Sequence, residues 1–150
     1  MGWLDGDWSE MIRVSEAIEQ KWWEKLPPEY AGVYRLVALT DSHSLVPSPI
    51  SRVCGVDDTG TLYVGASKGS LAVRVSDLIK TYHRDYKSSP HRELPKRLAD
   101  RFPDDKLAIS WELTNEPWVR EAKLLTAYEN SFGELPPNLA YPVETDNHYM

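Results

Sequence analysis

The sequence predicts a mixed α/β (α+β) domain with a small, mainly antiparallel three-stranded sheet flanked by helices. Three segments, at 32–39, 61–67 and 107–113, have β-prone or alternating composition. Segments with helical hydrophobic spacing lie between and around them, and such helices bury their apolar side by packing against a sheet. The 150 residues are enough for one compact domain, so we expect a single domain over 1–150.

Residues 7–26 predict an amphipathic helix. Asp7 can serve as the N-cap, and Glu10 three residues later completes a capping box. The following positions share one face at helical spacing: Trp8, Met11, Ile12, Ser15, Ile18, Trp22 and Leu26. The Pro27-Pro28 pair ends the helix. We therefore expect residues 1–30 to form a helical extension that packs against the rest of the domain.

The segments 32–39 and 61–67 predict two strands that pair as a hairpin. The connection between them, 40–60, is rich in Ser, contains two Pro residues and ends in the turn signal Asp57-Asp58-Thr59-Gly60. A short β-prone run at 52–56 can add a strand inside this connection. The hairpin is thus expected to have a long connecting loop that contains some structure of its own.

A helix is predicted from the N-cap Ser70 to about His83. Its buried stripe comprises Leu71, Val75, Leu78 and Tyr82. Arg74 lies roughly 100° from that stripe, on the flank of the helix. A shorter helix that carries Leu94 and Leu98 is expected next.

The alternating strand at 107–113 precedes a last helix, which Asn115 can cap and which runs to about Phe132, where Gly133 stops it. We expect its inner side to carry Trp118, Ala122, Leu125 and Phe132. Four tryptophans are expected in the core: Trp8, Trp22, Trp111 and Trp118. The core of the domain is then 31–139, followed by a tail at 140–150.

Composition restricts the classes of function. The single cysteine, Cys54, excludes an internal disulfide and a multi-cysteine metal site. No membrane-spanning run and no signal-peptide layout are present, so a cytoplasmic protein without membrane contact is expected. The net charge is −6, yet the segment 68–101 holds nine Lys/Arg against four Asp/Glu, a local balance of +5. Such asymmetry can give an acidic protein one basic face.

Two tripeptides on neighbouring strands resemble those of the GIY-YIG nuclease superfamily. They are Gly32-Val33-Tyr34 and Tyr63-Val64-Gly65, each with an Ile-to-Val exchange. The family pattern also has an arginine in the next helix, here Arg74, and a glutamate in the last helix, here Glu121. The stretch Phe132–Asn138 is similar to an ending of bacterial members, and the order of elements agrees with the family's. The resemblance covers the predicted core.

The resemblance implies a metal-dependent endonuclease whose catalytic residues are Tyr34, Tyr63, Arg74 and Glu121. Glu121 would bind one Mg²⁺ or Mn²⁺, since a carboxylate suits a hard cation that keeps most of its waters. The metal would act as a Lewis acid on the scissile phosphate. Arg74 offers a planar donor fork to phosphate oxygens. The two tyrosines would orient or deprotonate the attacking water, and Asn138 would support the metal end.

The expected substrate is DNA, with RNA not excluded. Basic side chains would follow the phosphate backbone: Lys68, Lys80, Arg84, Lys87, Arg92, Lys96 and Arg97. The 28 residues between Tyr34 and Tyr63 form a long insertion that could also contact DNA. Cutting both strands with one site per chain would favour a homodimer.

One departure from the family pattern leaves alternatives open. Many relatives have a lysine three residues after the second tyrosine, where this chain has Ala66. The cation that activates a tyrosine would then be Lys68, Arg74 or the metal. The alternatives are a catalytically inactive fold of this type that binds nucleic acid or protein, and an interaction domain whose Trp-rich first helix docks a partner.

Overall fold

A computed structural model describes residues 2–83 and 101–139 of the chain. The elements of that part are, in order, β1 (Ile12–Arg13), the 3₁₀ turn η1 (Val14–Glu16), α1 (Trp22–Lys25), β2 (Gly32–Ala38), β3 (Ile50–Arg52), β4 (Gly55–Asp57), β5 (Thr61–Ser67), α2 (Leu71–Tyr82), the 3₁₀ turn η5 (Asp104–Lys106), β6 (Leu107–Leu113), α3 (Pro117–Phe132) and the 3₁₀ turn η6 (Pro137–Leu139). This is an α+β architecture, which confirms the predicted class.

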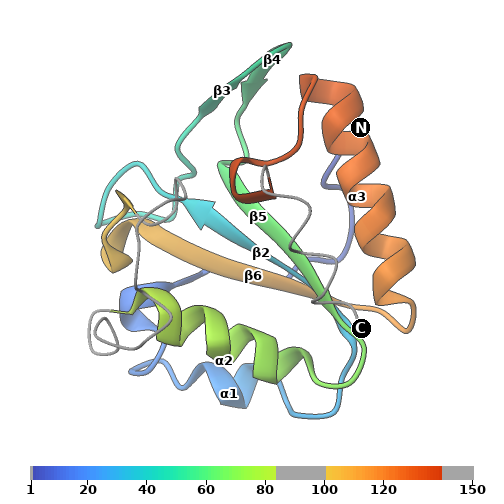
Figure 1. Ribbon diagram of the computed structural model, residues 1–150. Helices are drawn as coiled ribbons and strands as arrows, with labels where there is room; N and C mark the ends of the chain where they lie inside the picture. Colours follow the sequence, from blue (N-terminus) through green and yellow to red (C-terminus); the bar gives the residue numbers. More distant parts are fainter. Residues whose placement is uncertain (1, 84–100, 140–150) are drawn as a thin grey trace.

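The main sheet has four strands in the order β1-β6-β2-β5, and its pairings are antiparallel (Figure 1). Strand β2 is central, and its Tyr34 lies opposite both Gly65 of β5 and Trp111 of β6. The three predicted strands are confirmed to within one residue of their expected ends. The predicted strand number is wrong, because the short strand β1 pairs with the outer edge of β6.

The predicted continuous helix over 7–26 is wrong: Ile12 and Arg13 form β1, and the helical turns after it are only η1 at Val14–Glu16 and α1 at Trp22–Lys25. Ser9 exchanges hydrogen bonds with Trp111, and Ile12 and Arg13 pair with β6. These contacts satisfy the edge of β6, which would otherwise leave backbone N–H and C=O groups unpaired. The buried Arg13 guanidinium donates to three backbone carbonyls of neighbouring loops, which fixes the extended path.

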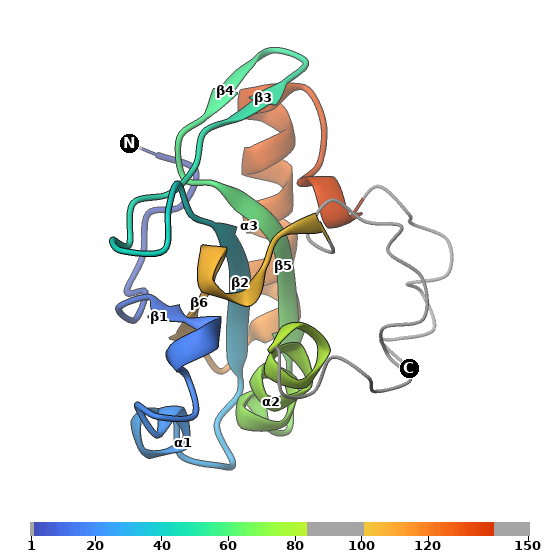
Figure 2. The same cartoon turned by 90° about the vertical axis from the view of Figure 1, so that its left-hand side faces the viewer.

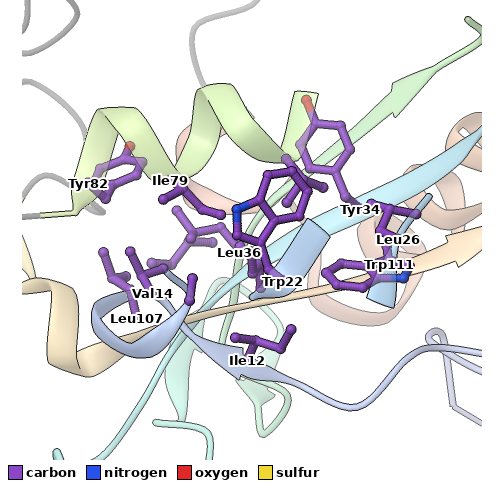
Figure 3. Packing of buried hydrophobic residues seen from close by; sticks show 14 of the residues in the cluster. Ile12, Val14, Trp22, Leu26, Tyr34, Leu36, Ile79, Tyr82, Leu107 and Trp111 are labelled. Carbon is purple, nitrogen blue, oxygen red and sulfur yellow. The ribbon is translucent and has the colours of Figure 1, made fainter. Parts of the chain in front are cut away.

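The sheet separates two apolar layers. On the side that we call the α2 face, α1 and α2 cover a cluster that includes Tyr34, Leu36 and Trp111 (Figure 3). On the opposite side, the α3 face, Leu124 of α3 packs on Val33 of β2 and on neighbouring residues of β5. Because side chains alternate along β2, the strand contributes residues to both layers, and all residues of β2 are buried.

Residues 40–60 form more than a loop, because β3 and β4 pair as a separate two-stranded sheet. This hairpin projects from the main sheet beside the C-terminal end of α3 (Figures 1 and 2). Arg52 forms an ion pair with Glu134 at 3.1 Å, and the Cys54 N–H donates to the carbonyl of Phe132 at 2.8 Å. The insertion is thus fixed to the end of α3.

Helix α3 has the predicted length but a different inner side. Its buried residues are Pro117, Glu121, Leu124 and Tyr128. The expected inner residues Trp118, Ala122 and Leu125 each lie one position further along, a rotation of about 100°. Trp118 is 36% exposed, so its placement in the core is wrong, whereas Trp22 and Trp111 are buried as predicted. Trp8 is half-buried. The predicted face of α3 is wrong because the buried side includes Glu121, which an apolar pattern does not count as an inner residue.

Two expectations lie outside the described residues: the shorter helix with Leu94 and Leu98, and the tail at 140–150. Across the ranges 2–83 and 101–139, no helix has the length and apolar character needed to cross a membrane. The single domain over 1–150 stays a prediction.

A buried carboxylate joins the N-terminal segment to α3. Glu112 of β6 is 9% exposed and accepts hydrogen bonds from Nε of Arg120 at 2.6 Å and from the N–H of Asp7 at 2.7 Å. Arg120 also donates to the carbonyl of Asp5 at 2.6 Å. Sheet, helix and N-terminal segment therefore share one ion pair.

We expect Glu112→Ala to lower the free energy of unfolding by about 1–3 kcal/mol, since it leaves Arg120 and the Asp7 N–H without their acceptor. Urea unfolding followed by circular dichroism measures this. The matched control is Glu129→Ala, at an exposed position of α3, which should change stability by less than about 0.5 kcal/mol. Equal unfolding midpoints for the two variants would contradict the role of the ion pair.

Candidate active site

The two tyrosines of the tripeptides lie together on neighbouring strands. Tyr34 of β2 faces Gly65, and Tyr63 of β5 faces Leu36, so the tyrosines form a diagonal pair across the two strands. Their ring centroids are 5.9 Å apart with an interplanar angle of 46°. Tyr34 is buried, whereas Tyr63 is half-buried and contacts the apolar clusters of both sheet faces. The pair therefore sits at the β5 edge of the sheet.

The glycines of both tripeptides allow close packing at this edge. A Cβ atom at Gly65 would overlap Cζ and the hydroxyl oxygen of Tyr34. A Cβ atom at Gly32 would overlap the carbonyl oxygen of Glu112 and would lie 2.8 Å from Cδ2 of Leu71. Gly65 makes room for the Tyr34 ring. Gly32 lets α2 start directly against the first residue of β2.

Three predicted site residues influence the pKa of the fourth, Tyr34. Burial raises the pKa of Tyr34 well above its ordinary value of 10. Tyr63 adds to this rise through its charge and through a hydrogen bond between the two side chains, and Glu121 adds to it as well. Arg74 acts in the opposite direction and lowers the pKa of Tyr34. The structure thus brings Tyr34, Tyr63, Arg74 and Glu121 into one electrostatic neighbourhood.

These residues come from four different elements. Arg74 is exposed on the first turns of α2, and Glu121 is 7% exposed on the inner side of α3. Asn138 is 3% exposed on η6, and both η6 and α3 contact β5. Arg74 is thus an exposed cation, whereas Glu121 and Asn138 are buried polar groups.

The predicted nucleic-acid contacts are only partly described. Lys68, just after β5, and Lys80, near the end of α2, are exposed. The remaining predicted basic contacts lie outside the described residues: Arg84, Lys87, Arg92, Lys96 and Arg97. A basic face made by the whole segment therefore stays a prediction.

Glu121 is the predicted metal ligand, and its carboxylate belongs to the described part of the chain. Over the described part of the chain, no group of three or more His, Cys, Asp or Glu side chains gathers as a metal cage. Glu121 instead offers one carboxylate in the neighbourhood of the two tyrosines. Mg²⁺ is often held by one or two carboxylates while it keeps several waters and binds substrate phosphate. Glu121 fits that mode of binding.

A buried polar group on the α3 face was not predicted from the sequence. It consists of Arg35, Asp57, Thr61 and Tyr128, which are buried and joined by hydrogen bonds. Burial lowers the pKa of Arg35 to about 10, against the opposing effect of Asp57. The available signal was an arginine in the middle of an otherwise apolar strand, since a buried charge needs partners.

Comparison with protein-family models, with curated proteins and with solved structures gave no match.

We expect Gly65→Ala to lower the free energy of unfolding by about 1–3 kcal/mol, because the added methyl group displaces the buried Tyr34 ring. Thermal and urea unfolding measure the change. Gly69→Ala is the matched control, since no atom lies within 4 Å of its added Cβ. That control should keep or raise stability by up to about 1 kcal/mol, as alanine reduces the entropy of the unfolded chain. Equal stabilities would refute the packing of Tyr34 on Gly65.

The raised pKa of Tyr34 also predicts a pH dependence of stability. The folded protein keeps the Tyr34 proton at pH values where the unfolded chain has lost it, so this stabilisation is complete below pH 10 and is lost as pH rises through the folded-state pKa. In urea unfolding above pH 10, the stability of Tyr34→Phe should fall less steeply than that of the unsubstituted protein. Tyr30→Phe, at a 48% exposed position, is the control and should keep the original slope.

Proposed function

We propose that the protein is a metal-dependent endonuclease of the GIY-YIG type that hydrolyses phosphodiester bonds in DNA. One observation carries the proposal: the tyrosines of both tripeptides form a contacting pair whose electrostatics include Arg74 and Glu121. The sequence spreads these residues over nearly 90 positions, from Tyr34 to Glu121. Two phenols, a guanidinium and a carboxylate at one sheet edge are the groups that phosphodiester hydrolysis needs.

The environments of the tyrosines suggest different roles. At pH 7, ionising even an unperturbed tyrosine costs about 4 kcal/mol, and the raised pKa of Tyr34 increases that cost. Tyr34 is therefore suited to act as a neutral phenol that holds and orients Tyr63 or a water. Tyr63 is half-buried at the edge of the sheet, where an attacking water can reach it. We propose Tyr63 as the residue that takes the proton of this water.

The charged residues would act on the phosphate. Arg74 is exposed on α2 and can turn its donor fork toward two phosphate oxygens as negative charge develops on them. Glu121 would hold one Mg²⁺ or Mn²⁺, with Asn138 as a polar neighbour that orients the carboxylate or a water. When bound, this ion would supply Lewis-acid polarisation of the scissile phosphate.

The departure at Ala66 has a packing explanation in this chain. Ala66 is 5% exposed and belongs to the α3-face cluster with Val33 and Leu124. A lysine there would have to carry its charge through an apolar layer, which is costly without a partner. Arg74, whose charge opposes the rise in the pKa of the neighbouring Tyr34, is the better candidate for the cation that activates Tyr63.

The proposed substrate is DNA, with RNA as a second polyanion to be tested. A chain with a net charge of −6 can bind DNA only through a local basic surface, and Lys68, Arg74 and Lys80 provide exposed cations on and near α2. Binding should therefore weaken steeply as salt concentration rises. A homodimer would allow two sites to cut both strands.

The direct test is incubation of the protein with supercoiled plasmid, linear duplex, single-stranded DNA and RNA, with Mg²⁺, with Mn²⁺ or with EDTA. We expect metal-dependent cutting that Glu121→Gln lowers by about 100-fold or more, the scale of losing one charged transition-state contact. Glu129→Gln, an exposed glutamate on the same helix, is the matched control and should cut normally.

Two outcomes would count against the proposal: no cutting of any substrate in either metal, or equal cutting by Glu121→Gln. Salt-sensitive binding of DNA without cutting would instead support the alternative of an inactive fold that serves as a binding module. A further comparison of Arg74→Ala with Lys80→Ala separates loss of chemistry from loss of one phosphate contact. Only Arg74→Ala should lower the single-turnover rate at saturating DNA.

A further inference from the structure

The buried carboxylate of Asp57 connects three parts of the fold. Asp57 is the last residue of β4 and is fully buried. Its Oδ1 accepts hydrogen bonds from the N–H and the hydroxyl of Thr59 at 2.8 and 2.6 Å. Its Oδ2 accepts hydrogen bonds from the N–H of Thr61 at 3.3 Å and from the hydroxyl of Tyr128 at 2.9 Å. One side chain thus holds the turn before β5, the start of β5, and helix α3.

The start of β5 contains the irregularity that sets the position of Tyr63. Leu36 lies opposite Tyr63, but the next residue of β2 lies opposite Thr61, so β5 has one extra residue, Leu62. In a regular strand, Leu62 and Tyr63 would point to opposite faces. Here both contact the cluster of the α2 face, and Tyr63 reaches the cluster of the α3 face as well. The bulge therefore allows Tyr63 to lie between the two faces.

The same polar group holds the bulge from the α3 face. Nη1 of Arg35 donates to the Thr61 hydroxyl at 3.2 Å, and the Thr59 and Thr61 hydroxyls lie 2.9 Å apart. The guanidinium of Arg35 stacks over the Trp8 ring, with Cζ 5.5 Å from its centroid. Because Arg35, Asp57 and Thr61 are buried, a shift of Thr61 would leave several polar groups unsatisfied, which is costly.

The third connection reaches the other half of the site. Tyr128 lies seven residues after Glu121 on α3, so both side chains point to the same side of the helix, two turns apart. The Tyr128 ring packs on Trp3 and Phe132, while its hydroxyl is bound to Asp57. The Asp57–Tyr128 hydrogen bond therefore fixes the rotation of α3 that turns Glu121 inward.

We propose that Asp57 is a positioning residue: it holds Tyr63 on β5 and Glu121 on α3 in a fixed relation, through Thr61 and Tyr128. The role in catalysis rests on the proposed nuclease function, but the positioning is a property of the folded chain and can be measured without substrate. Asp57 is hydrogen-bonded to Thr59, Thr61 and Tyr128, so it would act on Tyr63 and Glu121 through these neighbours.

The test uses Tyr128→Phe, which removes the hydroxyl and keeps the ring, beside Asp57→Asn. Ile12→Val is the control, a mild core substitution in β1 at the opposite edge of the sheet. Each full-length protein is labelled with 3-fluorotyrosine, and the fluorine NMR signals of Tyr34 and Tyr63 are assigned by their Phe substitutions. Spectra are recorded at a temperature at which circular dichroism shows every variant folded.

We expect both network variants to shift the Tyr63 signal and the control to leave it in place. In cleavage assays we expect kcat to fall about tenfold with KM for DNA within about twofold, because positioning acts on the reacting groups and not on binding. If Asp57→Asn does not fold, Tyr128→Phe decides alone. Unchanged signals and unchanged kcat in Tyr128→Phe would overturn the positioning role, even if the protein is a nuclease. If the unsubstituted protein cuts nothing, the proposed function fails, and the fluorine signals still decide the positioning.

Discussion

The pairing of strand β2 on both of its sides is the constraint on which the fold depends. Its residues are buried, and its backbone bonds to β5 and β6. Because side chains alternate along a strand, a register that buries Leu36 on one face must also place Val33 on the other. A slip of one residue would exchange side chains between the two layers and turn Tyr34 to the α3 face. The position of the tyrosine pair is therefore secured by the whole hydrophobic core.

The sequence predicts well the elements whose patterns are set locally. Strands β2, β5 and β6 and helix α2, with Ser70 as its N-cap, follow from alternation, helical spacing and capping. The N-terminal helix failed for the opposite reason. Residues 7–26 satisfy helical spacing, but the edge of β6, about 100 residues away, offers backbone hydrogen bonds that the extended form of Ser9 to Arg13 can use. A local pattern contains no information on such a distant edge.

The candidate site was predicted residue by residue only through the resemblance, and its buried surroundings were not predicted at all. On α3, counting apolar residues places Trp118 and Ala122 inside, but both are exposed, and Glu121 and Tyr128 occupy the inner side. Hydrophobic spacing treats a buried glutamate as a surface residue, because burial of a carboxylate is favourable only when distant partners are present. These partners, such as Asp57 for Tyr128, are far away in the sequence. The error in the helix face and the missed polar group thus have one cause.

The two tyrosines differ in burial, and this difference suggests different roles for them. The same packing that makes room for Tyr34 over Gly65 removes that phenol from water and raises its pKa, so it is held neutral. A neutral buried phenol keeps a fixed hydrogen bond, which suits orientation better than proton abstraction. Tyr63 lies half-buried on the edge strand, where α2 brings an arginine and α3 brings a carboxylate. If the site is catalytic, we expect its reactivity to come from this edge, because Tyr63 is partly accessible to water there and Arg74 of α2 is exposed.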